Sequence, residues 1–128
     1  MHISRNASET RGFTLVEIMV VVAIVGLLAS IAVTNVIIAR DNSRLTIIQH
    51  NLRKIDEAKQ QWAADNRQGN GAPVADITVL SGYFHGGDVN QVAQETYVPN
   101  AIGTPPEAAL PPGVSLGPYG PGTSIPAP

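Results

Sequence analysis

An uninterrupted apolar run near the N-terminus constrains this 128-residue chain more than any other feature. The run extends from Phe13 to Ala39, and Glu17 is its only charged residue. A helix of this length exceeds the roughly 20 residues that cross the hydrocarbon core of a bilayer. A carboxylate inside such a helix costs on the order of 2.5 kcal/mol or more. The sequence therefore predicts a membrane-spanning helix with one acid that another group must neutralise.

The residues before this run differ from an ordinary secretory signal. Such a signal has an apolar region of about 7–15 residues followed by a small-residue cleavage site. Here the apolar region is longer, and the small residue Gly12 lies before it, directly after the basic Arg11. A cut between Gly12 and Phe13 would remove the leader, keep the whole helix and create an α-amino group one helical turn from Glu17.

The segment Gly-Phe-Thr-Leu-Val-Glu, from Gly12 to Glu17, followed by an apolar helix, resembles the class III signal of type IV pilins and type II secretion pseudopilins. The resemblance implies that a prepilin peptidase cleaves after Gly12 and N-methylates Phe13. It also implies that Glu17 meets the terminal amine of a neighbouring subunit inside a helical filament. Because desolvation largely cancels the attraction within such a pair, we expect the pair to set register rather than to add stability. Two other roles for Glu17 stay open, namely snorkelling to the interface and complementing the helix dipole.

The same resemblance implies partners and a location. The expected partners are further copies of the chain in a homopolymer, a prepilin peptidase, an inner-membrane assembly platform and the lipid of the inner membrane. The subunit would be a single-pass inner-membrane protein before assembly and part of a periplasmic or extracellular filament afterwards. The short head favours a pseudopilin slightly over a pilin. The alternative is an uncleaved, monomeric membrane anchor that carries a periplasmic binding module.

Beyond the apolar run the sequence predicts that the helix continues as an amphipathic segment over residues 40–68. Apolar side chains recur there at spacings of three and four, which is typical of a helix packed along one face. We interpret this face as the surface that packs on the C-terminal head of the same chain, through Leu52, Ile55 and Trp62. The alternative is a coiled coil with another chain.

The whole predicted helix runs from Phe13 to about Asn66 and is roughly 80 Å long. Gly26 and Ser30 form a pair of small residues that would allow close approach of sister helices. Helices of the resembled family usually have a proline where this chain has Thr34. Proline removes a backbone hydrogen bond, whereas threonine can only bend the helix slightly by bonding back to a carbonyl.

The last sixty residues have a different composition, with all ten prolines and ten of the twelve glycines. We expect a loop-rich head of the α+β class, in which the prolines confine any sheet to short ladders. The predicted elements are a short helix at 74–80, strands at 96–98, 100–103 and 114–116, and an extended or mobile tail at 117–128. The chain thus divides into a leader at 1–12, a transmembrane helix at 13–39, an amphipathic continuation at 40–68 and a head at 69–128.

No arrangement of residues predicts catalysis or a metal site. The three histidines are scattered, there is no cysteine, and a net charge of −2 gives no basic surface for nucleic acid. Some pseudopilin heads hold calcium through clustered carboxylates. The acids of this head are too widely spaced to form such a loop, so we expect no cofactor and keep calcium as the disfavoured alternative. They are Asp76, Asp88, Glu95 and Glu107.

The basic residues are distributed unevenly along the chain. All eight lysines and arginines lie at or before Arg67. Arg5 and Arg11 before the apolar run favour a cytoplasmic leader by the positive-inside rule. Arg40 and Arg44 directly after the run weaken that bias.

Overall fold

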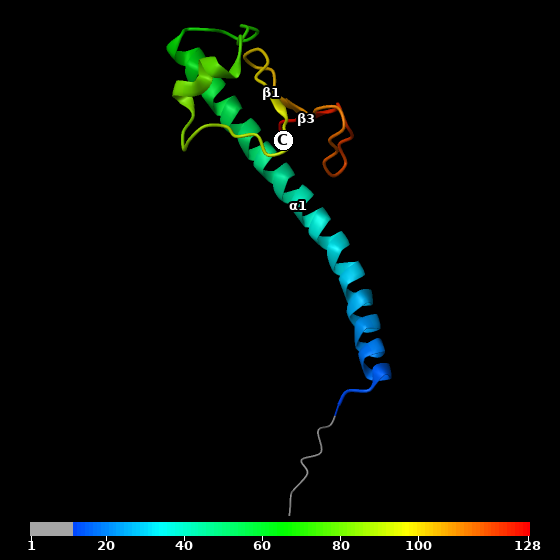
Figure 1. Cartoon of the computed structure of the whole chain (residues 1–128). Coiled ribbons are helices and arrows are strands. Elements are labelled where there is room, and N and C mark those ends of the chain that lie inside the picture. The colour runs from blue at the N-terminus through cyan, green and yellow to red at the C-terminus, as the bar shows by residue number, and fades with distance from the viewer. Residues whose placement is uncertain (1–11) are drawn as a thin grey trace, which may run out of the picture. The chain divides into compact units, whose positions relative to one another are not determined.

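The computed structural model describes residues 12–128, so the predictions for the leader up to residue 11 lie outside it. The elements are a helix α1 (Leu15–Asp65), a 3₁₀ helix η1 (Ile77–Tyr83) and the strands β1 (Thr96–Val98), β2 (Glu107–Ala109) and β3 (Ser124–Pro126). Figure 1 shows them in chain order. The α+β class, with a long N-terminal helix and a small loop-rich head, is confirmed. The chain divides between Val36 and Ile37 into two compact units, which are described separately.

In the first unit every described side chain of α1 is exposed. By length and composition α1 is the one helix among residues 12–128 that could cross a membrane. The Ser30 hydroxyl donates to the Leu27 carbonyl at 2.7 Å, and the Thr34 hydroxyl donates to the Ser30 carbonyl at 3.3 Å. The helix continues through Thr34 without interruption, because threonine keeps the backbone N–H that proline would remove.

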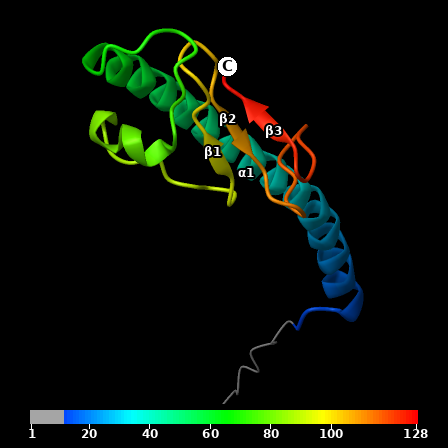
Figure 2. The same cartoon turned by 90° about the horizontal axis from the view of Figure 1, so that it is seen from above.

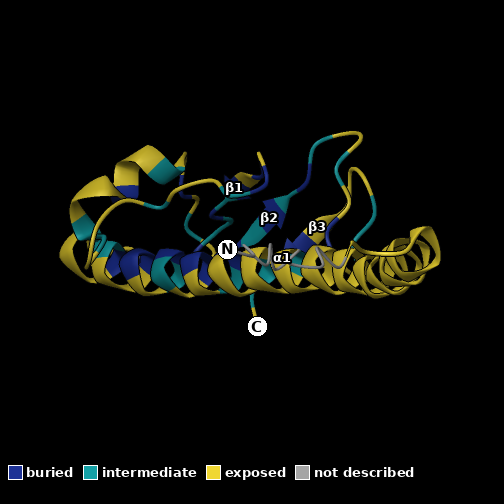
Figure 3. Cartoon of the chain, turned by 60° about the horizontal axis from the view of Figure 1, so that its bottom comes forward, coloured by how far each residue is buried: buried dark blue, intermediate teal, exposed yellow. Residues whose placement is uncertain are grey.

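In the second unit a hydrophobic core lies between one face of α1 and the segments that follow it. Ile48, Leu52 and Ile55 are fully buried, at the alternating spacings of four and three that one helix face requires. Leu80 of η1 and Leu116 are fully buried in the same core. Figure 3 shows the buried residues of α1 on the side towards the strands. The packing of the amphipathic half of α1 on the head of its own chain is therefore confirmed.

The sheet is antiparallel with the order β1-β2-β3 and lies along α1, as Figure 2 shows. Its middle row joins Tyr97, Ala108 and Ile125, which are opposite one another in the ladder and all buried. Their neighbours on each strand are half-buried or exposed, which is the alternation of a sheet with one covered face. β1 coincides with the strand predicted at 96–98.

The predicted strand at 100–103 is wrong. Asn100 and Gly103 have φ angles of +57° and +84°, and an extended strand requires negative φ. These residues form the turn that leads to β2, which is the true partner of β1. The sequence Glu-Ala-Ala of β2 has low strand propensity, so only its pairing on both sides makes it a strand.

The C-terminal predictions also need correction. Residues 114–116 contain one isolated bridge, at Leu116, because Gly117 turns the chain with φ +57°. A Cβ at Gly117 would lie 2.9 Å from the Leu45 Cδ1 atom, so a larger residue would have to displace that side chain as well as adopt a positive φ. Of the two states predicted for the tail, extended and mobile, the structure has the extended one at β3, which buries Ile125 completely. The prolines and glycines of this segment predict a loop, and the single large aliphatic residue Ile125 gives no strand pattern by itself.

The short helix begins three residues later than predicted at 74–80, and it is a 3₁₀ helix. The Asp76 carboxylate accepts a hydrogen bond from the Ile77 N–H and so caps the first turn. Asp76 itself has an extended backbone, so the helix cannot begin before Ile77, and Leu80 anchors η1 in the core. The cap therefore overrides the apolar pattern that suggested an earlier start.

α1 ends in a Schellman motif that contains no glycine. The Gln68 N–H donates to the Ala63 carbonyl at 2.8 Å, and the Arg67 N–H donates to the Ala64 carbonyl at 3.4 Å. Arg67 takes the left-handed position with φ +52°, which glycine usually occupies. Gly69 and Gly71 lie beyond the end of the helix.

Replacing Arg67 with glycine should therefore stabilise the head. A left-handed conformation costs a residue with a side chain roughly 1–2 kcal/mol. The variant Arg67→Ala keeps this strain and removes the same charge, so it is the matched control. We expect Arg67→Gly to exceed Arg67→Ala by about 1 kcal/mol in free energy of unfolding, followed through Trp62 fluorescence in detergent micelles. Equal stability of the two variants would show that the helix ends differently.

Candidate functional site

The predicted processing site lies directly before α1. Gly12 and Phe13 precede the helix, and the Phe13 side chain is 80% exposed. No atom lies within 4 Å of a Cβ built on Gly12. Both residues that flank this peptide bond are thus exposed in the described part of the chain.

The first turn of α1 is closed by a hydroxyl that the sequence analysis missed. Thr14 is the residue before the helix, and its Oγ1 accepts a hydrogen bond from the Glu17 N–H at 3.2 Å. This is half of a capping box, in which threonine is followed three residues later by glutamate. The spacing Thr-x-x-Glu was visible in the sequence and could have predicted the cap.

The Glu17 carboxylate lies at the start of the apolar helix without a partner. It is exposed, and it makes no hydrogen bond or ion pair with any residue in the range 12–128. Glu17 lies in the first turn of α1, where the positive end of the helix dipole stabilises its negative charge. This stabilisation is weaker than that of a direct ion pair. In a bilayer or among apolar helices, a carboxylate so placed attracts a cation from another molecule or from the chain's own amino end.

Gly26 and Ser30 lie one helical turn apart on a face of α1 that no residue in the range 12–128 covers. No atom lies within 4 Å of a Cβ built on Gly26. The Ser30 hydroxyl is satisfied within its own helix, so it needs no partner to enter an apolar environment. A neighbouring helix could approach closely here.

The three predicted head-packing residues differ in burial. Leu52 and Ile55 are fully buried, whereas Trp62 is half-buried and packs at the border of the core. The position between them on the same face is held by Lys59, which is 1% exposed. We therefore expect truncation of Trp62 to cost less than the roughly 3–5 kcal/mol of a fully buried tryptophan.

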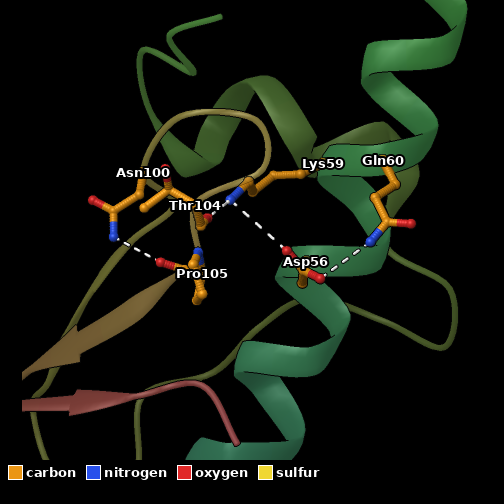
Figure 4. Close-up of polar contacts among 6 residues, drawn as sticks. All are labelled: Asp56, Lys59, Gln60, Asn100, Thr104 and Pro105. Atoms are coloured by element: carbon orange, nitrogen blue, oxygen red, sulfur yellow. Dashed lines mark hydrogen bonds and ion pairs between the residues drawn. The ribbon is translucent and has the colours of Figure 1, made fainter. Parts of the chain in front are cut away.

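Lys59 ties α1 to the loop between β1 and β2. Its Nζ donates to the Thr104 carbonyl at 2.5 Å and lies 3.8 Å from Asp56 Oδ1, as Figure 4 shows. Burial lowers the pKa of the Lys59 ammonium, and the Asp56 carboxylate acts in the opposite direction. The Asn100 amide donates to the Pro105 carbonyl at 2.9 Å and closes the same loop. The arrangement is structural, because each group serves to hold the loop on the helix.

A cavity of about 480 Å³ lies beside this contact. Asp56, Lys59, Gln60 and Asn70 supply its polar lining, and prolines 105 and 106 supply much of its apolar lining.

A second buried network joins α1 to the segment before β1. Glu95 is completely buried, and its carboxylate accepts from the Val92 and Ala93 N–H groups at 2.7–3.2 Å and from the Tyr97 hydroxyl at 2.6 Å. The Asn51 amide donates to the Tyr97 oxygen at 2.9 Å. Burial raises the pKa of the Tyr97 hydroxyl, so Tyr97 remains a donor. Sequence reasoning missed this network because its link to α1 joins Asn51 to Tyr97, which are 46 residues apart in the chain.

The acids considered for calcium have other positions or partners. Asp76 caps η1, Glu95 is buried in its network, and Asp88 is exposed. Within residues 12–128 no three acidic, histidine or cysteine side chains gather as a metal site would require.

Comparison with known proteins bears on the N-terminal segment first. Residues 8–33 match the family described as the prokaryotic N-terminal methylation motif, which includes Gly12, Phe13 and Glu17. Over 116 residues, 90% of this chain and 53% of the relative, the chain is 34% identical to the type IV major pilin protein PilA of Myxococcus xanthus. Over 58 residues, 45% of this chain and 41% of the relative, it is 40% identical to the type II secretion system core protein G of Pseudomonas aeruginosa.

The chain therefore spans about half the length of the curated relatives it matches. No solved structure matches it. The methylation motif and the two relatives confirm the resemblance seen in the sequence. The chain carries a prepilin-type N-terminal methylation motif and is similar to a type IV pilin and to a type II secretion protein.

Proposed function

We propose that the chain is a structural subunit that polymerises through α1 into a pilus-type or pseudopilus-type filament. The observation that carries the proposal is Glu17, whose carboxylate has no partner among residues 12–128 and lies at the start of a helix whose apolar side chains are exposed. Bundling of copies would cover these side chains and bring a cation to the acid. The methylation motif and the names of both relatives support this assignment over a monomeric anchor.

The proposal includes the partners and places that filament assembly needs. A prepilin peptidase would cleave after Gly12 and methylate Phe13, and an inner-membrane platform would extract the subunit from the lipid. Nucleic acid has no role in this scheme, and neither has catalysis or a cofactor. Calcium in the head is disfavoured because Asp76 already caps η1 and Glu95 already accepts hydrogen bonds in the buried network.

Within this proposal we favour a pilus over a pseudopilus. The match to the major pilin covers nine-tenths of the chain, so it includes most of the head. The match to the secretion protein covers under half of the chain. This reverses the slight preference for a pseudopilin that the short head suggested, and the pseudopilus stays the second candidate.

Processing at Gly12 tests the proposal at its first step. Because the bond after Gly12 is exposed and flanked by the motif, we expect the mature chain to begin with N-methylated Phe13. Intact mass and N-terminal sequencing of membrane-derived protein measure this directly. A bulky residue at position 12 should leave a full-length precursor in the membrane, whereas Gly26→Ala, which lies inside the helix, should be processed normally. A mature wild-type chain that retains the leader would refute the assignment.

A further inference from the structure

Arg40 and Arg44 are two basic residues that neither the fold nor the proposed function uses. Both are exposed on α1, directly after the apolar run, and neither forms an ion pair with any residue in the range 12–128. They are one helical turn apart and therefore lie on the same face. Like charges at this spacing destabilise a helix by a few tenths of a kcal/mol, and Asp41, three residues before Arg44, offsets part of this repulsion.

Their height along α1 places them at the level of lipid phosphates. If the bilayer core of about 30 Å begins at Glu17, it takes up about 20 residues and ends near Ile37. The backbone of Arg40 then lies about 4–5 Å beyond the core and that of Arg44 about 10 Å beyond it. The headgroup layer on each side is roughly 5–8 Å thick. Both guanidinium groups can reach it, and tilt of the helix would bring them closer.

The chemistry of the pair fits a phosphodiester. A guanidinium presents a planar fork of donors that matches phosphate oxygens, and two such groups on one face can hold one anionic headgroup. We propose that Arg40 and Arg44 form a binding site for an anionic phospholipid at the membrane surface next to the head, which fixes the depth of the unassembled subunit. The inference rests on the membrane stage of the proposed function. It explains why basic residues follow the apolar run on the side where the positive-inside rule disfavours them.

The test uses the full-length chain in detergent micelles, with phosphatidylglycerol and phosphatidylcholine of identical acyl chains as probes. Native mass spectrometry measures the fraction of protein that retains each lipid. The wild type should prefer phosphatidylglycerol by roughly tenfold to thirtyfold, the ratio expected for two basic residues near an anionic surface. The double variant Arg40→Gln/Arg44→Gln should lose this preference. Arg53→Gln is the matched control, because Arg53 is also exposed but lies about 20 Å further along the helix.

Each outcome decides the proposal. Equal retention of both lipids by the wild type, or a preference that survives in the double variant, would overturn it. Chemical cross-linking of the wild type and the double variant measures contact between copies. If the double variant keeps the lipid preference but gives no cross-linked dimers, the two arginines contact an acidic surface of a second copy, and the lipid proposal is wrong. The variant Glu17→Leu should keep the lipid preference, although we expect it to form no filament. Lipid binding and filament assembly are therefore measured independently, and either proposal can fail without the other.

Discussion

Replacing Glu17 with leucine should give a chain that is processed and stable in the membrane but forms almost no filament. The head lies in a separate unit from Glu17, so the substitution leaves its core unchanged. Leucine makes α1 a better membrane helix, because it removes a group that costs on the order of 2.5 kcal/mol in the bilayer. The same change removes the attraction for a neighbour's amine that would place each entering subunit. The measurement is the yield of sheared filaments relative to the membrane pool, with cleavage followed in parallel.

Two further variants separate charge from helix capping. Glu17→Gln keeps the shape and the backbone N–H that Thr14 caps, and it removes only the charge, so it should also polymerise poorly. Thr14→Ala removes the cap and keeps the charge, and it should reduce helix stability by about 1 kcal/mol. Normal filament yield from Glu17→Leu would show that Glu17 is an interface residue without a role in assembly.

The helix and its packing face could be predicted from the sequence because their information is local. The apolar run and the spacing of Ile48, Leu52 and Ile55 each have the period of a helix, and the structure has α1 within two residues of the predicted ends. The cap at Thr14 was equally local and was missed only because the Thr-x-x-Glu spacing was not considered.

Most of the head could not be predicted, because non-local contacts decide its structure. β2 has the sequence Glu-Ala-Ala, and it is a strand only because β1 and β3 pair with it on both sides. Lys59 interrupts the apolar face of α1 in the sequence, yet it is buried because the Thr104 carbonyl accepts its hydrogen bond. Neither the strand at β2 nor the burial of Lys59 can be predicted from the residues that are adjacent in the sequence.

The candidate site shows the same division. The residues Gly12, Phe13 and Glu17 form a compact motif, so their chemistry could be proposed from spacing alone. Only the structure shows that no group within residues 12–128 pairs with the Glu17 carboxylate.

The largest effect on the head should come from Glu95→Ala. Glu95 lies at the centre of a buried network, where it accepts hydrogen bonds from two backbone N–H groups and from Tyr97. Removing the carboxylate leaves these donors buried without an acceptor, at a cost of roughly 1–3 kcal/mol each. It also releases the segment that Asn51 holds against α1 through Tyr97 and the Asn90 carbonyl.

We therefore expect Glu95→Ala to lower the free energy of unfolding by roughly 3–5 kcal/mol, a large fraction of the 5–15 kcal/mol of a typical domain. The measurement is denaturant unfolding of the full chain in detergent micelles, followed through the single tryptophan, Trp62. Asp88→Ala is the matched control, since it removes an exposed carboxylate from the same stretch of chain and should change stability by less than about 0.5 kcal/mol. Glu95→Gln keeps one acceptor oxygen but brings two donors into a site that already has three, so it should lie between the two. If Glu95→Ala unfolds at the same midpoint as Asp88→Ala, the carboxylate lies in water and the network does not hold the head on α1.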